Sequence, residues 1–372
     1  VEGVNSGGGF NEEEKDNGKK DEDFLKWFSE LSNKDILIAG GKGASLGEMF
    51  QNRFPVPPGF VVTAHAFDTF VTQNDIKEQI NDVLSKIDVE DTQELHDASK
   101  TVRALFESKD IPKEIEDEIL EAYHILSSEK IDEAGVSQDA LNILKSAQEP
   151  MFVSVRSSAT TEDLVDASFA GQQESFLNIK GDRQLLMHVK KCISSLYTPR
   201  AIYYRKKKGF KEGQALLAVV VQKMIDSEKS GVVFSRDPVN LSDNVAIESV
   251  YGLGEGIVGG KIKPDHQIVS RELEIKSIKV ADKKIALVRS GSGENGMVKL
   301  SDERSKTQVL SRGEIKEIAD YAIKLEEHYD KPQDIEFAVE AGHVYILQSR
   351  PITTLKTEKS ERGEISGNVI LD

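Results

Sequence analysis

The chain has 372 residues, 38% of them hydrophobic, which suffices for a substantial core in two domains or in one large domain of two lobes. The formal net charge of -16, from 48 Lys and Arg against 64 Asp and Glu, excludes a general nucleic-acid binder, because affinity for a phosphate backbone requires a basic surface. The single cysteine, Cys192, excludes a disulfide framework and a cysteine-rich zinc site, and no apolar run approaches the roughly 18 residues that cross a bilayer, so we expect a cytoplasmic protein with no membrane partner.

The ends of the chain differ in composition from its middle. Residues 1–22 are rich in glycine and then in charge, and they carry too little apolar surface to order themselves, so we predict a disordered tail. Between the ends we predict an N-terminal lobe over residues 23–214 and a C-terminal lobe over residues 215–356. Residues 357–372 begin with the charged stretch TEKSERG and are predicted to form a linker.

The first segment after the tail joins a short apolar run to a glycine-rich stretch. Residues Ile36–Ala39 are predicted to form a strand, followed by a glycine turn and a helix start in GGKGASLGEM, residues 40–49. Backbone N–H groups in such a turn can approach an oxyanion closely, and Lys42 adds a positive charge. The spacing is not that of a Walker A loop. An ordinary glycine turn with a surface lysine is the alternative that this segment leaves open.

Helical and extended patterns then follow in blocks. Apolar residues recur at helical spacing from about Ala64 to Ala147, and another helix is predicted over Gln184–Arg205. Short strands are predicted at residues 60–63, 152–155, 216–223, 231–235 and 245–250. Strands with segregated helical stretches predict an α+β fold, and we expect an enzyme domain of two lobes with a cleft between them.

The densest polar segment of the chain is VSVRSSATTEDLVDASFAGQQESF, residues 153–176. Arg156 leaves a predicted strand directly into a run of serine and threonine, whose hydroxyls and backbone amides suit a phosphate that the arginine clamps. Small residues at 168–173 supply a second loop. A serine-rich capping region with a structural arginine is the alternative reading of the same residues.

A glycine motif follows the strand predicted at residues 245–250. Residues 254–259 fit the G-x-G-x-x-G pattern of dinucleotide-binding proteins, but GKIKP follows where an apolar helix should begin. We therefore favour a mobile glycine loop over a dinucleotide site. None of the seven histidines has a partner at a spacing that marks a metal triad or a hydrolase, and Cys192 lies on a helical pattern as a small core residue.

Two alternating segments near the C-terminal end, 334–340 and 344–350, read as a hairpin joined by Ala-Gly-His at residues 341–343. A three-residue loop pairs Glu336 with Gln348 and Asp334 with Arg350. A two-residue loop would place Gln348 opposite Ile335 and scatter these polar side chains.

The three-residue loop also predicts how the two faces of the hairpin differ. The apolar face then consists of Ile335, Phe337, Val339, Tyr345 and Leu347. The other face carries a carboxylate, an amide and a guanidinium in a short row, which suits a metal ion bridging to a polyphosphate. An amphipathic hairpin whose polar face meets water remains open.

These segments occur together, in one order, in a known family. The motifs GGKGASLGEM, FPVPPGFVVTAHAFDTF, VSVRSSATTEDLVDASFAGQQESF, SLYTPRAIYYR, VVVQKMI, GVVFSRDP, ESVYGLGEGIVGG and DIEFAVEAGHVYILQSRPIT closely resemble the nucleotide-binding domain of phosphoenolpyruvate synthases. Pyruvate phosphate dikinases and rifampin phosphotransferases share the same plan. The resemblance covers about Phe24 to Thr354 and implies an ATP-grasp-like domain of two lobes, with ATP and Mg²⁺ in the cleft.

The resemblance also implies roles for particular residues. Lys42 and Arg156 match residues that hold phosphates, and Gly171 and Ser175 match residues that line the same pocket. Relatives often have threonine at position 175, so the hydroxyl is kept. Gln222 matches the residue that meets the nucleoside.

A second group of matching residues lies on the predicted hairpin. Glu336 and Gln348 match ligands of Mg²⁺ and phosphate, and Arg350 matches the cation beside them. The family match and the three-residue loop thus place the same residues on one face by separate arguments.

The reaction of the family implies further partners. A histidine on a swivelling domain accepts a phosphoryl group from ATP and carries it to an acceptor such as pyruvate on a third domain. The signatures of both domains are missing, so we expect a fragment or a split subunit that binds ATP but does not turn over pyruvate alone. GASLGEM and TPRAIYYR favour the synthases, which convert pyruvate, ATP and water into phosphoenolpyruvate, AMP and phosphate. The alternatives are a phosphate, antibiotic or glucan acceptor, and a stand-alone nucleotide-binding regulatory module.

Overall fold

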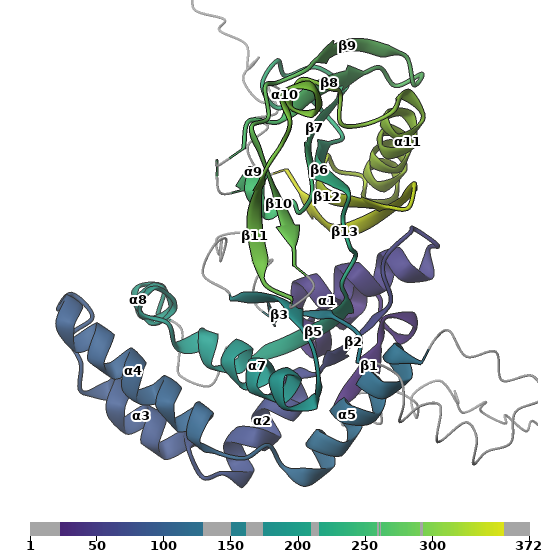
Figure 1. Ribbon diagram of the computed structural model, residues 1–372. Helices are drawn as coiled ribbons and strands as arrows, with labels where there is room; N and C mark the ends of the chain where they lie inside the picture. The colour runs from purple at the N-terminus through teal and green to yellow at the C-terminus, as the bar shows by residue number, and fades with distance from the viewer. Residues whose placement is uncertain are drawn as a thin grey trace, which may run out of the picture. The chain divides into compact units, whose positions relative to one another are not determined.

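The computed structural model describes residues 23–128, 150–160, 174–209, 216–258, 260, 262–290 and 293–352. The predicted tail, the predicted linker and Gly171 lie outside these residues. The chain divides into two compact units (Figure 1). The first runs to Ile225 and includes Arg289–Asn295, and the second consists of Asp226–Val288 and the chain from Gly296 onward.

The first unit is built on a five-stranded antiparallel sheet of order β1-β2-β5-β3-β4. Its strands are β1 (Leu25–Trp27), β2 (Gly59–Val62), β3 (Val153–Ala159), β4 (Ser175–Ile179) and β5 (Leu217–Lys223). Strand β5 lies at the centre and is buried from Leu217 to Gln222, because both neighbours and both faces cover it. It thus belongs to this sheet, whereas the boundary predicted at residue 214 assigned it to the other lobe.

Helices pack on this sheet and supply most of its core. They are α2 (Ala64–Gln73), α3 (Lys77–Ser85), α4 (Thr92–Ser108), α5 (Lys113–Ser127), α7 (Asp182–Ser194) and α8 (Pro199–Lys207). The helical pattern predicted from Ala64 onward is confirmed as far as Ser127. The single helix predicted over Gln184–Arg205 is wrong, because Thr198 caps a new helix there with Pro199 at its first position.

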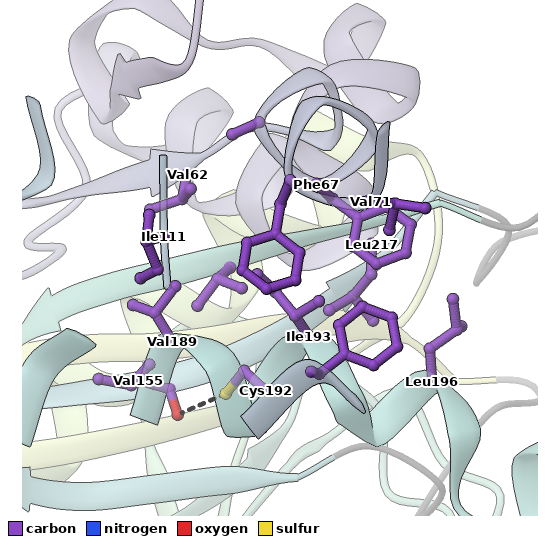
Figure 2. Packing of buried hydrophobic residues seen from close by; sticks show 14 of the residues in the cluster. Val62, Phe67, Val71, Ile111, Val155, Val189, Cys192, Ile193, Leu196 and Leu217 are labelled. Carbon is purple, nitrogen blue, oxygen red and sulfur yellow. Dashed lines mark hydrogen bonds between the residues drawn. The ribbon is translucent and has the colours of Figure 1, made fainter. Parts of the chain in front are cut away.

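The core of the first unit contains the only cysteine. Figure 2 shows Cys192 among Val155, Val189 and Ile193, with its thiol donating to the Val155 carbonyl oxygen at 3.4 Å. The side chain is fully buried, and burial raises the pKa of the Cys192 thiol. The prediction of a small core residue is therefore confirmed.

The segment predicted as a strand and a glycine turn is instead a broken helix, α1 (Ile36–Gln51). Four apolar residues do not distinguish a strand from a buried helical turn, which is why the prediction failed. The break lies at Gly40, whose φ of 68° and ψ of 170° are not helical. A Cβ at Gly40 would lie 2.2 Å from the backbone oxygen of Ser158, so the close approach of α1 to β3 requires glycine.

The second unit holds a six-stranded antiparallel sheet of order β13-β12-β6-β7-β8-β9. Its strands are β6 (Lys229–Phe234), β7 (Val245–Tyr251), β8 (Asp265–Val269), β9 (Ile275–Lys279), β12 (Gln333–Glu340) and β13 (His343–Pro351). A separate ribbon pairs β10 (Ile285–Arg289) with β11 (Asn295–Lys299). The short helices α9 (Glu255–Val258) and α10 (Asp302–Ser305) complete the second unit together with α11 (Arg312–Tyr329).

Helix α11 covers one face of this sheet, where it contacts β6, β7, β8 and β12 (Figure 1). Helix α11 was not predicted, although the sequence contains its signals. Ser311 and Glu314 form a capping box, and apolar residues recur at helical spacing after it. Strands β8 to β11 were not predicted either, because their alternation is weak and interrupted by charges. Helix α9 after β7 has only four residues, unlike the helix that a dinucleotide-binding motif requires.

Glu314→Gln is expected to lower stability in a pH-dependent way. Burial by itself raises the pKa of Glu314, but hydrogen bonds from Lys229 and Ser311 outweigh it and hold the pKa below the ordinary 4.5. A lowered carboxyl pKa stabilises the fold above pH 4.5, and this contribution is lost as the pH falls through the folded-state pKa. We expect a loss of about 1–2 kcal/mol in the free energy of unfolding at pH 7.

Urea unfolding at pH 7 and at pH 3.5 measures this dependence. The difference in the free energy of unfolding between variant and wild type should be smaller at the lower pH. Glu327→Gln, an exposed carboxylate on the same helix, is the control and should stay near wild type at both values. A gap that stays constant with pH would contradict the role given to the Glu314 charge.

Candidate functional site

In the first unit, the break in α1 is joined to β3 by one buried side chain. The hydroxyl of Ser158 donates to the Ala39 carbonyl oxygen at 2.8 Å and accepts from the Gly43 backbone N–H at 3.1 Å. Lys42 precedes Gly43 and is half-buried. The predicted phosphate-binding lysine is thus fixed at the point where the helix resumes after Gly40.

Arg156 lies on β3 two residues before Ser158, so both side chains are on the same face of the strand. Ser175 on β4 pairs directly with Arg156 and is exposed. Arg156 is half-buried, and the part of the chain that the structure describes offers it no ion pair or side-chain hydrogen bond. A half-buried guanidinium without an anion is suited to bind one from solution.

The hydroxyls that follow Arg156 do not serve as expected. Ser157 donates to the Glu174 carbonyl oxygen and Thr160 to the Leu216 carbonyl oxygen, both at 3.1 Å. Ser158 is engaged with α1 as described. The prediction that the hydroxyls of this run bind phosphate is wrong for Ser157, Ser158 and Thr160, because each of these buried hydroxyls already donates to a main-chain carbonyl oxygen. Thr161 lies outside the described residues.

Gln222 lies near the end of the central strand β5, opposite Gly59 and Ser154. Its side chain is 1% exposed and its amide donates to the Pro57 carbonyl oxygen at 3.2 Å. A nucleoside at this position would have to use the remaining donor or acceptor capacity of the amide.

In the second unit, the β12–β13 hairpin has the predicted pairing of Glu336 with Gln348, but its loop and register differ from the prediction. The loop has two residues, Ala341 and Gly342, with φ values of 50° and 79° that suit a type I′ turn. A β-bulge after Glu336 then shifts the register by one residue. As a result Glu336 does pair with Gln348, although the predicted three-residue loop was wrong.

The bulge changes which apolar residues share a face. Near the turn Phe337 pairs with Ile346 and Val339 with Val344, and all four are buried. The predicted apolar face is therefore confirmed for the β12 residues. It is wrong for β13, where Tyr345 and Leu347 are only half-buried.

Glu336 and Gln348 face away from α11. Lys229 of β6 pairs with Val339 and bonds to Glu314 of α11, so the Val339 face of the sheet is the one that α11 covers. Neither Glu336 nor Gln348 has an ion pair or a side-chain hydrogen bond among the described residues, and both are half-buried. Their Cβ atoms, as those of directly paired residues, lie about 4.5–5.5 Å apart.

Arg350 lies beside Gln348 on β13 and forms an ion pair within the hairpin. It is exposed, and its guanidinium contacts the Asp334 carboxylate at 2.8 and 2.9 Å. The pairing of these two residues is confirmed by the register. A polyphosphate near Arg350 would therefore compete with Asp334.

One residue on this face was missed. Val232 pairs with Glu336 on one side and with Glu248 on the other, which places the Glu248 carboxylate on the same face, two strands away. A glutamate inside the apolar strand VAIESV was the available signal. Nothing in the sequence alone revealed that its strand lies so near β12.

The donors on this face suit a Mg²⁺ ion that is also bound by substrate phosphates, rather than a metal ion that protein side chains hold by themselves. Among the described residues no cluster of three or more His, Cys, Asp or Glu side chains could hold an ion. Mg²⁺ is commonly bound by one or two carboxylates together with substrate phosphates and water. A half-buried carboxylate paired with an amide, both without partners in the described part of the chain, meets that requirement.

The chain belongs to a family defined by its nucleotide-binding domain. The family model for the pyruvate phosphate dikinase AMP/ATP-binding domain matches residues 36–366, which cover most of each unit. The chain therefore carries the AMP/ATP-binding domain of this dikinase family. Within the described residues, no helix is long and apolar enough to cross a membrane.

The curated relatives that resemble this chain include several phosphoenolpyruvate synthases. A probable phosphoenolpyruvate synthase of Methanocaldococcus jannaschii is 46% identical over 341 residues, covering 91% of this chain and 27% of that protein. A probable phosphoenolpyruvate synthase of Archaeoglobus fulgidus is 45% identical, covering 91% and 43%. The phosphoenolpyruvate synthase of Pyrococcus furiosus is 41% identical, covering 90% and 44%. The chain spans less than half the length of each of these relatives.

Proposed function

We propose that this chain binds ATP with Mg²⁺ and is the nucleotide-binding part of a phosphoenolpyruvate synthase. The complete enzyme would convert pyruvate, ATP and water into phosphoenolpyruvate, AMP and phosphate. The names of the relatives support pyruvate as the acceptor. The observation that carries the proposal is the direct pairing of Glu336 with Gln348, two half-buried groups without partners in the described part of the chain.

Each of the two units, the lobes of an ATP-grasp-like domain in this proposal, would contribute its own ligands. From the first unit, Lys42 and Arg156 would bind phosphate oxygens, with Ser175 opposite Arg156 on β4. Gly171 would line the same pocket and Gln222 would meet the nucleoside.

From the second unit, Glu336 and Gln348 would hold Mg²⁺. Bound there, the ion would neutralise phosphate charge and orient the oxygens of the triphosphate. Arg350 would stay beside it, exchanging Asp334 for a phosphate oxygen when ATP is present.

The chemical task of these residues is electrostatic. An imidazole nitrogen from a separate domain would form a bond to the β-phosphorus of ATP while the bond from that phosphorus to the α–β bridging oxygen breaks and AMP leaves. Water would then release the γ-phosphate as inorganic phosphate, leaving one phosphoryl group on the histidine. The Arg156 guanidinium can donate two parallel hydrogen bonds to phosphate oxygens, and the Lys42 ammonium adds a point charge. Both would stabilise the charge that develops on the transferred group.

Transfer of label between separate domains tests this proposal. The chain is incubated with ATP labelled in its β and γ phosphates, Mg²⁺, and a separately produced phosphohistidine domain from a full-length relative. We expect acid-labile label on the histidine of that domain, and none when this histidine is replaced by alanine. Label on a histidine of this chain instead, or binding of ATP without any transfer, would contradict the proposal.

A further inference from the structure

We propose that Ser158 is a positioning residue for phosphate binding, which sets Lys42 in place relative to Arg156 by inserting its hydroxyl into the open turn of α1. This inference rests on the proposed function of Lys42 and Arg156 as phosphate ligands. It assigns a task to a side chain that touches no ligand itself.

The hydrogen bonds of Ser158 replace a missing helical bond. Ala39 and Gly43 are four residues apart, so in a continuous helix the Gly43 N–H would donate to the Ala39 carbonyl oxygen. The Ser158 hydroxyl bonds to both groups instead, accepting at 3.1 Å and donating at 2.8 Å. A side chain inserted into the helical hydrogen-bond ladder is a recognised cause of a sharp kink.

The backbone at Gly40 makes this insertion possible. Its φ of 68° lies in the left-handed region, where glycine carries no steric penalty. The virtual Cβ at Gly40 is 2.2 Å from the Ser158 backbone oxygen and 2.3 Å from its hydroxyl, so nothing larger than glycine fits between α1 and β3. The break in α1 and the strand β3 are therefore one packed unit.

The consequence is a fixed link between the two predicted phosphate ligands. Lys42 is the residue before Gly43, and Arg156 lies two residues before Ser158 on the same face of β3. Ser158 is fully buried, and water does not compete for its two bonds. Without the hydroxyl, the Gly43 N–H and the Ala39 carbonyl would lose their shared partner, and α1 would regain bonding only by closing its turn, which moves Lys42.

A double-mutant cycle on Ser158→Ala and Lys42→Met tests the link by calorimetry with MgATP. Ser158→Ala alone should weaken ATP binding about tenfold, the loss expected when a buried hydrogen bond no longer holds a charged ligand group. In the Lys42→Met background, Ser158→Ala should alter the affinity for ATP less than about twofold, because the effects of substitutions at coupled residues are not additive. Affinity for AMP should change less than affinity for ATP.

Ser99→Ala is the matched control for stability. Ser99 is also buried and donates one hydrogen bond, to the Tyr197 carbonyl oxygen at 2.7 Å, within the helical core of the same unit. It should lower the melting temperature as Ser158→Ala does but leave ATP affinity unchanged. Ser158→Ala binding ATP as wild type does, or weakening it equally with and without Lys42, would overturn the inference. If the wild type itself binds no ATP, the proposed function fails instead.

Hydrogen exchange of the wild-type protein adds a test that needs no variant. The Gly43 amide should exchange slowly, as a buried donor bonded to Ser158, and more slowly again with MgATP bound. Exchange at the rate of an exposed amide would contradict the inserted hydroxyl, whatever the variants do.

Discussion

Glu336→Gln is expected to weaken MgATP binding by about 10–100-fold, since it removes the carboxylate charge that is proposed to hold the ion. The substitution is nearly isosteric, and Glu336 has no ion pair among the described residues, so the sheet should keep its stability. The same variant should bind metal-free ATP at least as well as wild type, because a carboxylate that would repel the triphosphate is gone. Weaker binding of MgATP together with undiminished binding of metal-free ATP distinguishes a metal ligand from a residue with only a structural role.

Calorimetric titrations with ATP, in Mg²⁺ and in chelator, measure both effects. Glu340→Gln is the control, since Glu340 lies four residues further along β12 on the same face and accepts a hydrogen bond from the Asp226 backbone N–H at 2.8 Å. It should bind ATP as wild type does in both solutions. If Glu336→Gln lowers the affinity for ATP equally with and without Mg²⁺, Glu336 is not a metal ligand and only contacts ATP.

Lys283→Met is expected to cost about 3–5 kcal/mol of stability, the usual result of leaving a buried charge without its partner. Lys283 and Asp265 have side chains with 0% exposure and form an ion pair in the second unit. Asp265 also accepts the backbone N–H groups of Ala281 and Val309 at 2.8 and 2.9 Å. The carboxylate therefore ties the start of β8 to the segment that leads into α11, and it cannot be rehydrated when Lys283 is lost.

Lys284→Met is a control one residue away. Lys284 is exposed and pairs with Asp282 at 2.7 Å on the surface, where ion pairs contribute little. Chemical denaturation should show it near wild type. In Asp265→Asn with Lys283→Met most of the loss should be regained, since both charges are then absent. If Lys283→Met unfolds as readily as Lys284→Met, the buried pair is not needed for stability.

Sequence patterns predicted the fold best where local periodicity and burial agree. Helices α2 to α5 have long apolar stripes, and β2, β3, β5, β6 and β7 are short apolar runs between turn residues, so their positions were found. The sequence patterns gave wrong predictions where tertiary packing outweighs local conformational preference. The run at Ile36 has the composition of a strand, but the contact of Gly40 with Ser158 favours a broken helix.

The hairpin shows how the right pairing can follow from the wrong loop. The patterns of β12 and β13 each indicated a two-faced strand, and Glu336 opposite Gln348 was predicted. The actual turn has one residue fewer, and a bulge beside Glu336 compensates for it. A bulge depends on twist and on packing against neighbouring strands, which the local sequence does not encode in a readable way.

By itself, the sequence determined the class of protein and the α+β character of the chain, and it supplied the residues proposed to bind ATP, because binding motifs and apolar periodicity are local properties of a chain. Only the tertiary structure decided that β5 joins the first sheet, that Ser158 occupies the gap in α1, and that Glu248 shares a face with Glu336. These facts join residues far apart in the sequence. Their pairing is set by the packing of whole sheets, in which many weak contacts add up, and no single segment carries that information.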